Sequence, residues 1–236
     1  MYDDLEYRVA VHACWTGRLS ASQRQAASGL VADVGLRSGV TSGKHFDPLA
    51  AVVAKVFISS GLPKDSIHLN QRVELPGFFR AEKKWDLVAV HRGELVGAVE
   101  FKSMLGSYGN NLNNRAEEAI GNAHDLLEAY GEGRFGRSVR APWLGFLYVV
   151  QEEEKSTRPI STSQPHFEVD EVFDGASYLD RTVILCRRLV QRRLYSGACV
   201  ATSSGEGPEA VREPAKDLTF SKFAAGIVGR VGEVLA

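Results

Sequence analysis

The chain has 236 residues, of which 44% are hydrophobic and 24% charged, a composition that excludes a fibrous or largely disordered protein. Its net charge of −1 gives no sign of a nucleic-acid partner, so a DNA-binding surface must come from local clusters of basic residues. No apolar run approaches the roughly 20 residues of a membrane span, and the acidic N-terminal segment is unlike a signal peptide. We therefore expect a soluble, cytoplasmic protein.

The length fits one domain. Within 1–236 we expect a helical N-terminal part (1–65), a catalytic sheet core (66–150) and a C-terminal part of helices and loops (151–236). The cysteines are odd in number, far apart and in no metal-binding spacing, which predicts buried free thiols in a reducing compartment. They are Cys14, Cys186 and Cys199.

The first third of the chain has helical patterns. Residues 3–34 carry few breakers and mix apolar with polar positions, which predicts one or two helices. Asp47 and Pro48 are typical of an N-cap and a first helical position, and Gly61 would end the helix that they begin.

A β-rich segment follows. The stretch NQRVELPGFFRAEKK is extended and turns at Pro76-Gly77. The runs 85–90 (WDLVAV) and 94–101 (ELVGAVEF) flank His91-Arg92-Gly93, which predicts a β-hairpin.

Helices and one strand make up the rest of the prediction. The segment GSYGNNLNN is predicted to be a loop, followed by a helix that begins near Arg115. WLGFLYVV is almost purely apolar and predicts a buried central strand. Beyond it we expect a polar surface loop (EEEKSTRPISTSQP), a helix from about Tyr178 to Tyr195, a second loop (SSGEGPEAVREP) and a C-terminal helix after Asp217.

The hairpin carries the strongest indication of chemistry. Side chains alternate along a strand, so Glu100 and Lys102 project to the same face with Phe101 opposite. A three-residue turn can bring Asp86 on the first strand back beside them. Two carboxylates and a lysine are thus predicted to converge.

Such a group suits phosphodiester hydrolysis, which needs charge neutralisation at the phosphate and a hydroxide-like nucleophile. A hard cation such as Mg²⁺ held by oxygen ligands supplies both, and Asp86 and Glu100 are the natural ligands. Lys102 would orient or help to deprotonate the attacking water and stabilise charge on the scissile phosphate. A plain surface salt bridge is the alternative, because an Asp followed by ExK often arises by chance; the apolar surroundings of both acids favour the catalytic interpretation.

Several uncommon segments, in order along the chain, resemble the XhoI-type restriction endonucleases of the PD-(D/E)xK nuclease superfamily. They are LPGFFRAEKKWDLVAV, VEFKSMLGSYGNNLNNRAEEAIGNAHDLLEAY, PWLGFLYVV, SQPHFEV, ASYLDR and RRLY. Trp85 stands before Asp86 where the superfamily often has proline, but the aspartate is the metal ligand there.

The resemblance implies an α/β fold with a restriction-endonuclease-like core, a mixed β-sheet flanked by helices. It implies a Mg²⁺-dependent type II enzyme that cuts a short palindrome, CTCGAG in the best-known members, and leaves 5′ overhangs. A palindromic target suggests a two-fold symmetric homodimer, and the family implies a cognate DNA methyltransferase. The Phe101 backbone carbonyl would be a further metal ligand, and Glu74 is either an additional acidic residue near the metal or a solvated strand residue.

Two segments are candidates for contact with DNA. Arg80, Lys83 and Lys84 lie just before Asp86 and would meet phosphates, or else form a solvated basic turn. The loop after Lys102 offers side chains that read bases, although capping or turn duty is favoured for any single asparagine. Its candidates are Ser107, Tyr108, Asn110, Asn111, Asn113, Asn114 and Arg115.

A basic stripe on the later helix and two rival functions stay open. Arg187, Arg188, Arg192 and Arg193 could contact the DNA backbone, but pairing with carboxylates on the protein surface is the favoured default. The first rival is a structure-specific repair or recombination nuclease of the same superfamily. The second is a non-catalytic DNA-binding regulator in which the acids are structural.

Overall fold

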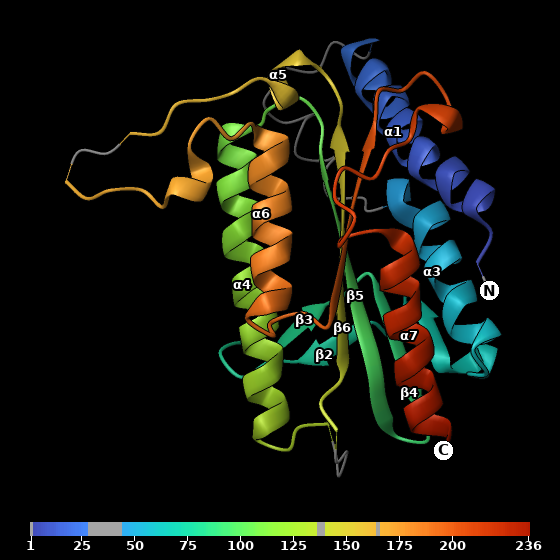
Figure 1. The fold of residues 1–236 in the computed structure, drawn as a ribbon. Coiled ribbons are helices and arrows are strands. Elements are labelled where there is room, and N and C mark those ends of the chain that lie inside the picture. Colours follow the sequence, from blue (N-terminus) through green and yellow to red (C-terminus); the bar gives the residue numbers. More distant parts are fainter. Residues whose placement is uncertain (1, 28–43, 136–139, 164–165) are drawn as a thin grey trace.

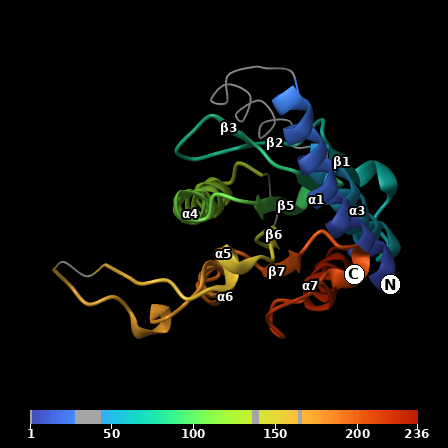
Figure 2. The same ribbon diagram turned by 90° about the horizontal axis from the view of Figure 1, so that it is seen from above.

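The computed structural model describes most of the chain. Described are residues 2–27, 44–135, 140–163 and 166–236, with the backbone alone described for 17–27 and for Lys44. A central sheet lies between two layers of helices, with α1, α3 and α7 on one face and α4 and α6 on the other (Figures 1 and 2).

The elements have the following bounds. The helices are α1 (Asp4–Ala27), α3 (Asp47–Ser59), α4 (Gly109–Gly131), α5 (Glu154–Thr157), α6 (Tyr178–Gln191) and α7 (Phe220–Leu235). The strands are β1 (Ile67–Leu69), β2 (Glu74–Pro76), β3 (Glu82–Lys84), β4 (Leu87–His91), β5 (Glu94–Met104), β6 (Trp143–Gln151) and β7 (Gly197–Ser203). Short 3₁₀ turns cover Lys44–Phe46, Lys64–Ser66, Glu171–Phe173 and Pro208–Ala210.

The main sheet is mixed and has the strand order β1-β4-β5-β6-β7. Strands β1, β4 and β5 pair antiparallel, whereas β5, β6 and β7 run parallel. Helices α4 and α6 make the two parallel crossovers, while β2 and β3 form a separate antiparallel hairpin. The mixed sheet flanked by helices, predicted from the sequence, is confirmed, as is the position of β6 inside it.

The β4–β5 hairpin is confirmed and has a shorter turn than predicted. Arg92 and Gly93, with φ of 50° and 80°, form a two-residue turn in the left-handed region. Leu87, the first residue of β4, pairs with Val99, so β5 continues past the start of its partner. The part of β5 that begins at Glu100 therefore lies beyond the ladder with β4.

Alternation along the strands divides the core into two clusters. Leu87, Val99 and Phe101 pack with the α1, α3 and α7 layer. Val88 and Ala98 pack in the cluster that includes buried residues of α4 and of the end of α6. Because side chains alternate, Glu100 and Lys102 share the α4 face with Ala98.

The start of α4 corrects the sequence prediction. The helix begins at Gly109, six residues before Arg115, and Tyr108 occupies the N-cap position, so neither Asn113 nor Asn114 caps it. Leu112 is buried in the first turns, and its packing outweighs the weak helix propensity of the glycine and the asparagines around it.

Other boundaries also differ from the predictions. Helix α3 begins at Asp47 itself, with Phe46 at the N-cap, and Gly61 follows it with φ of 114°. Helix α6 ends at Gln191, four residues before the predicted Tyr195, since Arg193 takes a positive φ. Strand β7 was not predicted, and the predicted loop after β6 contains the short helix α5.

Helix α1 reaches Ala27, and the rest of the predicted helical stretch, residues 28–34, lies outside the described residues. All three cysteines are free and buried, as predicted. No helix in the described part of the chain has the length and hydropathy needed to cross a membrane.

Candidate active site

The predicted group of Asp86, Glu100 and Lys102 lies where β5 leaves the start of β4. Asp86 precedes β4, and its Oδ2 accepts a hydrogen bond of 2.7 Å from the N–H of Phe101. The Lys102 Nζ lies 2.7 Å from Glu100 Oε1. The extension of β5 past β4 thus places both acids and the lysine at one edge of the hairpin.

Glu100 is a buried carboxylate surrounded by donors, with only 2% of its side chain exposed. The amide nitrogen of Asn122 donates to both of its oxygens at 2.9 and 3.0 Å, and the Tyr195 hydroxyl donates at 3.2 Å. Burial alone would raise the pKa of Glu100, but the charges of Lys102 and Lys83 lower it below its ordinary value. Glu100 is therefore held ionised.

Asp86 behaves in the opposite way. Burial, and then the negative charge of Glu100, raise the pKa of Asp86 above its ordinary value, although the Phe101 N–H opposes this. Two neighbouring carboxylates that repel each other in a buried place gain from a cation between them.

Two lysines converge on the same carboxylate. Lys83 Nζ lies 3.5 Å from Glu100 Oε1 and 4.2 Å from the ring centroid of Trp85. Burial lowers the pKa of Lys83. Burial also acts to lower the pKa of Lys102, but Glu100 outweighs it and the net change is upward. Lys102 is therefore an ammonium in this arrangement.

Helix α4 supplies residues that the sequence interpretation missed. Glu118 lies 3.3 Å from the Lys102 Nζ and also pairs with Arg115. Asn122, one turn further along, holds Glu100. The spacing of 115, 118 and 122 places them on one face of the stretch that was predicted to be helical, and this shared face is the signal that could have found them.

The β2–β3 hairpin is fastened to the same helix face. Arg80 donates to Asp125 Oδ2 at 2.7 Å and to Asn122 Oδ1 at 2.8 Å. The Asp125 Oδ1 accepts the N–H groups of Phe78 and Phe79 at 2.9 and 2.7 Å. Arg80, a candidate for phosphate contact, thus has an internal role, while 43% of its side chain stays exposed.

The remaining acidic and basic candidates lie at the surface of this hairpin. Lys84 is exposed on β3. Glu74 is exposed on β2, and its carboxylate accepts the N–H of Val73 at 3.1 Å. Glu118 is thus an acid that contacts Lys102, whereas the contact of Glu74 is with its neighbour Val73.

The candidates at the start of α4 divide into internal and exposed groups. Tyr108 is buried and donates to Glu153 at 2.7 Å, and Asn111 donates to the carbonyl of the exposed Ser107. Asn110, Asn113 and Asn114 are exposed on the first turns. Those three asparagines are the side chains free to meet a large ligand.

Two of the four arginines predicted to form a basic stripe on the later helix make ion pairs. Arg187 pairs with Asp217 at 2.6 Å and Arg188 with Asp170 at 2.5 Å, as the default expectation had it. Arg192 and Arg193 are exposed at the end of the helix.

Comparisons with known proteins identify the family to which this chain is related. A model of the restriction endonuclease XhoI family matches residues 24–211. The chain is 40% identical over 207 residues to the type II restriction enzyme BstVI of Geobacillus stearothermophilus, which covers 84% of this chain and 92% of that protein.

Two further relatives have similar sequence identity to this chain. The chain is 43% identical over 192 residues to the type II restriction enzyme XhoI of Xanthomonas vasicola, covering 80% of this chain and 75% of that protein. It is 43% identical over 162 residues to the type II restriction enzyme AbrI of Azospirillum brasilense, covering 68% and 72%. No solved structure matches. The family resemblance inferred from the sequence segments is confirmed, and the chain belongs to the XhoI restriction endonuclease family.

Proposed function

We propose that this chain, as a type II restriction endonuclease, hydrolyses both strands of a short palindromic DNA site in a Mg²⁺-dependent reaction centred on Asp86, Glu100 and Lys102. The observation that carries the proposal is the convergence of the buried Glu100 and the partly buried Asp86, whose carboxylates repel each other, with the Lys102 ammonium at one edge of the β4–β5 hairpin. A buried group of this charge pattern suits a hard cation and an anionic substrate.

The donors fit a magnesium ion. Asp86 and Glu100 offer carboxylate oxygens, and within a strand the N–H and C=O of one residue lie on the same edge, so the Phe101 carbonyl lies on the edge that faces Asp86. The described residues contain no group of three or more His, Cys, Asp or Glu side chains placed to hold a metal. Mg²⁺ is commonly bound by one or two carboxylates together with waters and substrate phosphates, so two acids suit it. When bound, Mg²⁺ would neutralise charge on the scissile phosphate and lower the pKa of a water molecule.

The chain's own groups orient the reaction. The Lys102 ammonium forms ion pairs with both Glu100 and Glu118, which hold it beside the carboxylates. From there it would position the attacking water and stabilise negative charge on the phosphate as that charge develops. Lys83, also at Glu100, and the exposed Lys84 would hold the phosphates on either side.

Recognition would come from the start of α4. Asn110, Asn113 and Asn114 are exposed there, and asparagine can pair with adenine in the major groove. Arg115 is engaged by Glu118 and would need to leave it in order to read a base. Each active site of a two-fold homodimer would cut one strand of the palindrome, for which we propose CTCGAG with 5′ overhangs. A cognate methyltransferase would protect host DNA.

A plasmid digest tests the proposal. The purified chain with Mg²⁺ should give discrete fragments whose sequenced ends share one palindrome and carry 5′ extensions, and EDTA should abolish them. Asp86→Ala and Lys102→Ala should remove cleavage but leave most DNA binding. Lys216→Ala, which changes an exposed lysine outside the site, is the control and should cut normally.

Two outcomes would replace the proposal. A smear, or cutting only of branched or single-stranded substrates, would indicate a structure-specific nuclease. Binding without cleavage under any divalent cation, unchanged in Asp86→Ala and Lys102→Ala, would indicate a DNA-binding regulator.

A further inference from the structure

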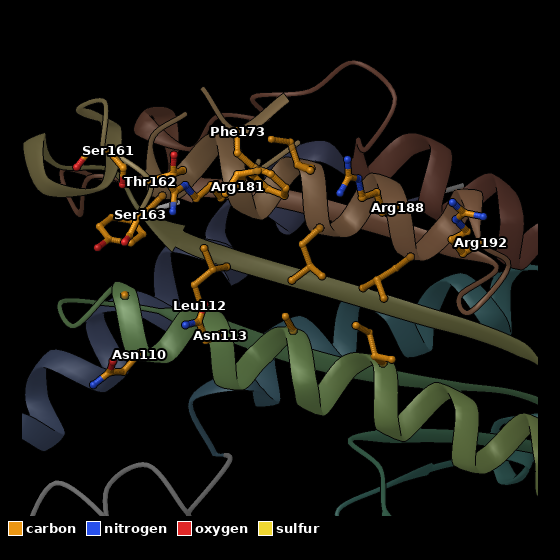
Figure 3. Close-up of a pocket in the computed structure, with 18 of the residues that line it drawn as sticks. Asn110, Leu112, Asn113, Ser161, Thr162, Ser163, Phe173, Arg181, Arg188 and Arg192 are labelled. Carbon is orange, nitrogen blue, oxygen red and sulfur yellow. Dashed lines mark hydrogen bonds between the residues drawn. The ribbon is translucent and has the colours of Figure 1, made fainter. Parts of the chain in front are cut away.

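A groove of about 720 Å³ lies between α4 and α6 (Figure 3). Its lining includes Leu112 of α4 and Ile184 and Leu189 of α6, which give it an apolar floor. Figure 3 shows Arg181, Arg188 and Arg192 along the α6 side of the groove. The groove thus combines an apolar floor with a basic rim.

The groove lies on the opposite flank of α4 from the active site. Glu118 and Asn122 contact the catalytic residues, whereas Ala116 and Ile120 line the groove. At 100° per residue, positions 118 and 122 point well away from positions 116 and 120. Helix α4 therefore separates the groove from the catalytic centre.

An arm, defined here as the described residues 158–163 and 166–176, stands out from the helices beside the groove (Figures 1 and 2). Phe167 on this arm is 88% exposed and Val172 45% exposed. Ile120 at the groove is 47% exposed. Of these three residues Ile120 lines the groove, whereas Phe167 and Val172 lie on the arm. One wall of the groove is formed by the arm of the same copy, through Ser161, Thr162, Ser163, Val169 and Phe173. Apolar side chains are thus exposed both in the groove and on the adjoining arm, where a partner would cover them.

The charges of the arm and the groove are complementary. The arm carries four acidic residues and Arg158 as its single basic one. Asp170 already pairs with Arg188 of the same chain, and Glu168, Glu171 and Asp174 are exposed. Across the groove, Arg192 is exposed and has no ion pair within the described residues. One copy of the chain therefore presents both an acidic apolar arm and a basic apolar groove.

We infer that the groove between α4 and α6 receives the arm of a second copy of this chain, with Phe167 on the apolar floor and the arm's exposed acidic residues against Arg192, because Arg181 and Arg188 are already bonded to the arm of their own copy. In a two-fold contact each copy gives its arm and receives the other, so a surface with both parts is self-complementary. The inference rests on the proposed function, for which it supplies the dimer interface. Asn110 and Asn113, which the proposed function assigns to DNA, lie at the α4 end of the groove (Figure 3). For the apolar part of the groove DNA is the less favoured occupant, because the acidic arm repels phosphates and the floor is apolar.

Sedimentation equilibrium of the full chain over a dilution series tests the interface. The wild-type chain should be a dimer, and Ile120→Asp and Phe167→Asp should each weaken dimerisation by about tenfold or more. Both positions are exposed, so neither change should disturb folding. The matched control is Val228→Asp on α7, where the valine is 51% exposed in the other helix layer, and it should leave the dimer unchanged.

Crosslinking locates the contact. The native cysteines are all buried, so Ile120→Cys and Phe167→Cys each add one accessible thiol. A short bis-maleimide should give covalent dimers from a mixture of the two variants, in excess over either variant alone. The pair Ile120→Cys and Val228→Cys should give none above background.

The outcomes separate this inference from the proposed function. Discrete, site-specific fragments from a wild-type monomer, or from a dimer that neither Asp variant weakens, would overturn the interface and leave the function standing. Variants that stay dimeric but lose DNA affinity would assign the groove to DNA instead. Loss of the dimer in both variants with Val228→Asp unaffected would support the interface, whether or not the wild-type chain cuts at one sequence.

Discussion

The two flanks of α4 differ in the interactions that their side chains make. On one flank Glu118, Asn122 and Asp125 are engaged by charged or polar partners on β5 and on the β2–β3 hairpin. On the other, Ala116 and Ile120 line an open groove, and the side chain of Ile120 is about half exposed. The first flank completes its contacts within the chain, whereas the second leaves apolar surface uncovered.

The polar contacts of the first flank are complete in one copy of the chain, whereas the apolar surface of the second flank is covered only when a partner binds it. Buried polar groups are hydrogen-bonded wherever they lie, so the flank that faces the proposed active site can be rigid in a single copy. An exposed apolar groove costs little in one copy and contributes free energy only when it is covered. Substitutions on the two flanks should therefore affect different measurements.

The largest effect is expected on the catalytic flank. Glu100→Gln keeps the size of the side chain but removes the charge that Lys102, Lys83 and the proposed metal face. Cleavage should fall by about 10³-fold or more, the scale of losing an electrostatic interaction made in the transition state. Single-turnover cleavage of a labelled duplex measures this, and near-normal cleavage would remove Glu100 from the chemistry.

Asn122→Ala should have the next largest effect. Without the amide, Glu100 loses two hydrogen bonds and Arg80 loses an acceptor, although no reacting group is removed. Loss of such a supporting contact should weaken metal affinity by about 10- to 100-fold, seen by calorimetry and as a higher Mg²⁺ requirement. Glu128→Ala, an exposed change on the same helix, should alter neither quantity. An equal loss in both variants would mean that α4 is merely destabilised.

Asp125→Asn tests how the hairpin is held. Burial acts to raise the pKa of Asp125, but the hydrogen bonds from Arg80, Phe79 and Phe78 lower it below its ordinary value of 3.8. The charge therefore stabilises the fold fully above pH 3.8, and this contribution is lost as the pH falls through the folded-state pKa. In urea unfolding near neutral pH the free energy of unfolding of the variant should be about 2 kcal/mol lower than that of the wild-type chain. This difference should shrink below pH 3.8. A pH-independent difference would assign the loss to packing.

The smallest effect is expected on the groove flank. Because Ile120 is about half exposed, Ile120→Asp should change the free energy of unfolding of one copy by no more than about 0.5 kcal/mol. Urea unfolding at a dilution where the chain is monomeric measures it. A loss of several kcal/mol would mean that the groove belongs to the core of a single copy.

Local patterns predicted the hairpin and its side chains well. Alternation places Glu100 and Lys102 on one face. The hairpin brings Asp86 beside them, with a register that is set by the turn together with an irregularity between Ala89 and Val90. Local sequence patterns gave wrong or incomplete predictions where packing between elements distant in sequence determines the structure. Leu112 extends α4 through a segment rich in asparagine that was predicted to be a loop. Glu118 and Asn122 lie inside the predicted helix, but their contacts with Lys102 and Glu100 depend on how α4 packs against β5.

Strand β7 was missed for a related reason. Its sequence, GACVATS, is short and carries small side chains, and its strand character comes from pairing with β6 and from burial on both faces. The contacts of Arg80 with Asn122 and Asp125 join segments more than 40 positions apart, which no spacing rule reaches. Pairings at such distances follow from the fold as a whole.

The central claim is that the carboxylates of Asp86 and Glu100 form a metal site, and calorimetric titration of Mg²⁺ into Asp86→Asn bound to an oligonucleotide duplex tests it most directly. Asparagine can still accept the Phe101 N–H through its side-chain oxygen, so the change removes charge and little else. The wild-type chain in the presence of Ca²⁺ in place of Mg²⁺ serves as a reference for DNA binding without cutting. We predict that the variant binds the duplex but takes up no Mg²⁺ and makes no cut. Undiminished Mg²⁺ uptake and cleavage by Asp86→Asn would contradict the account.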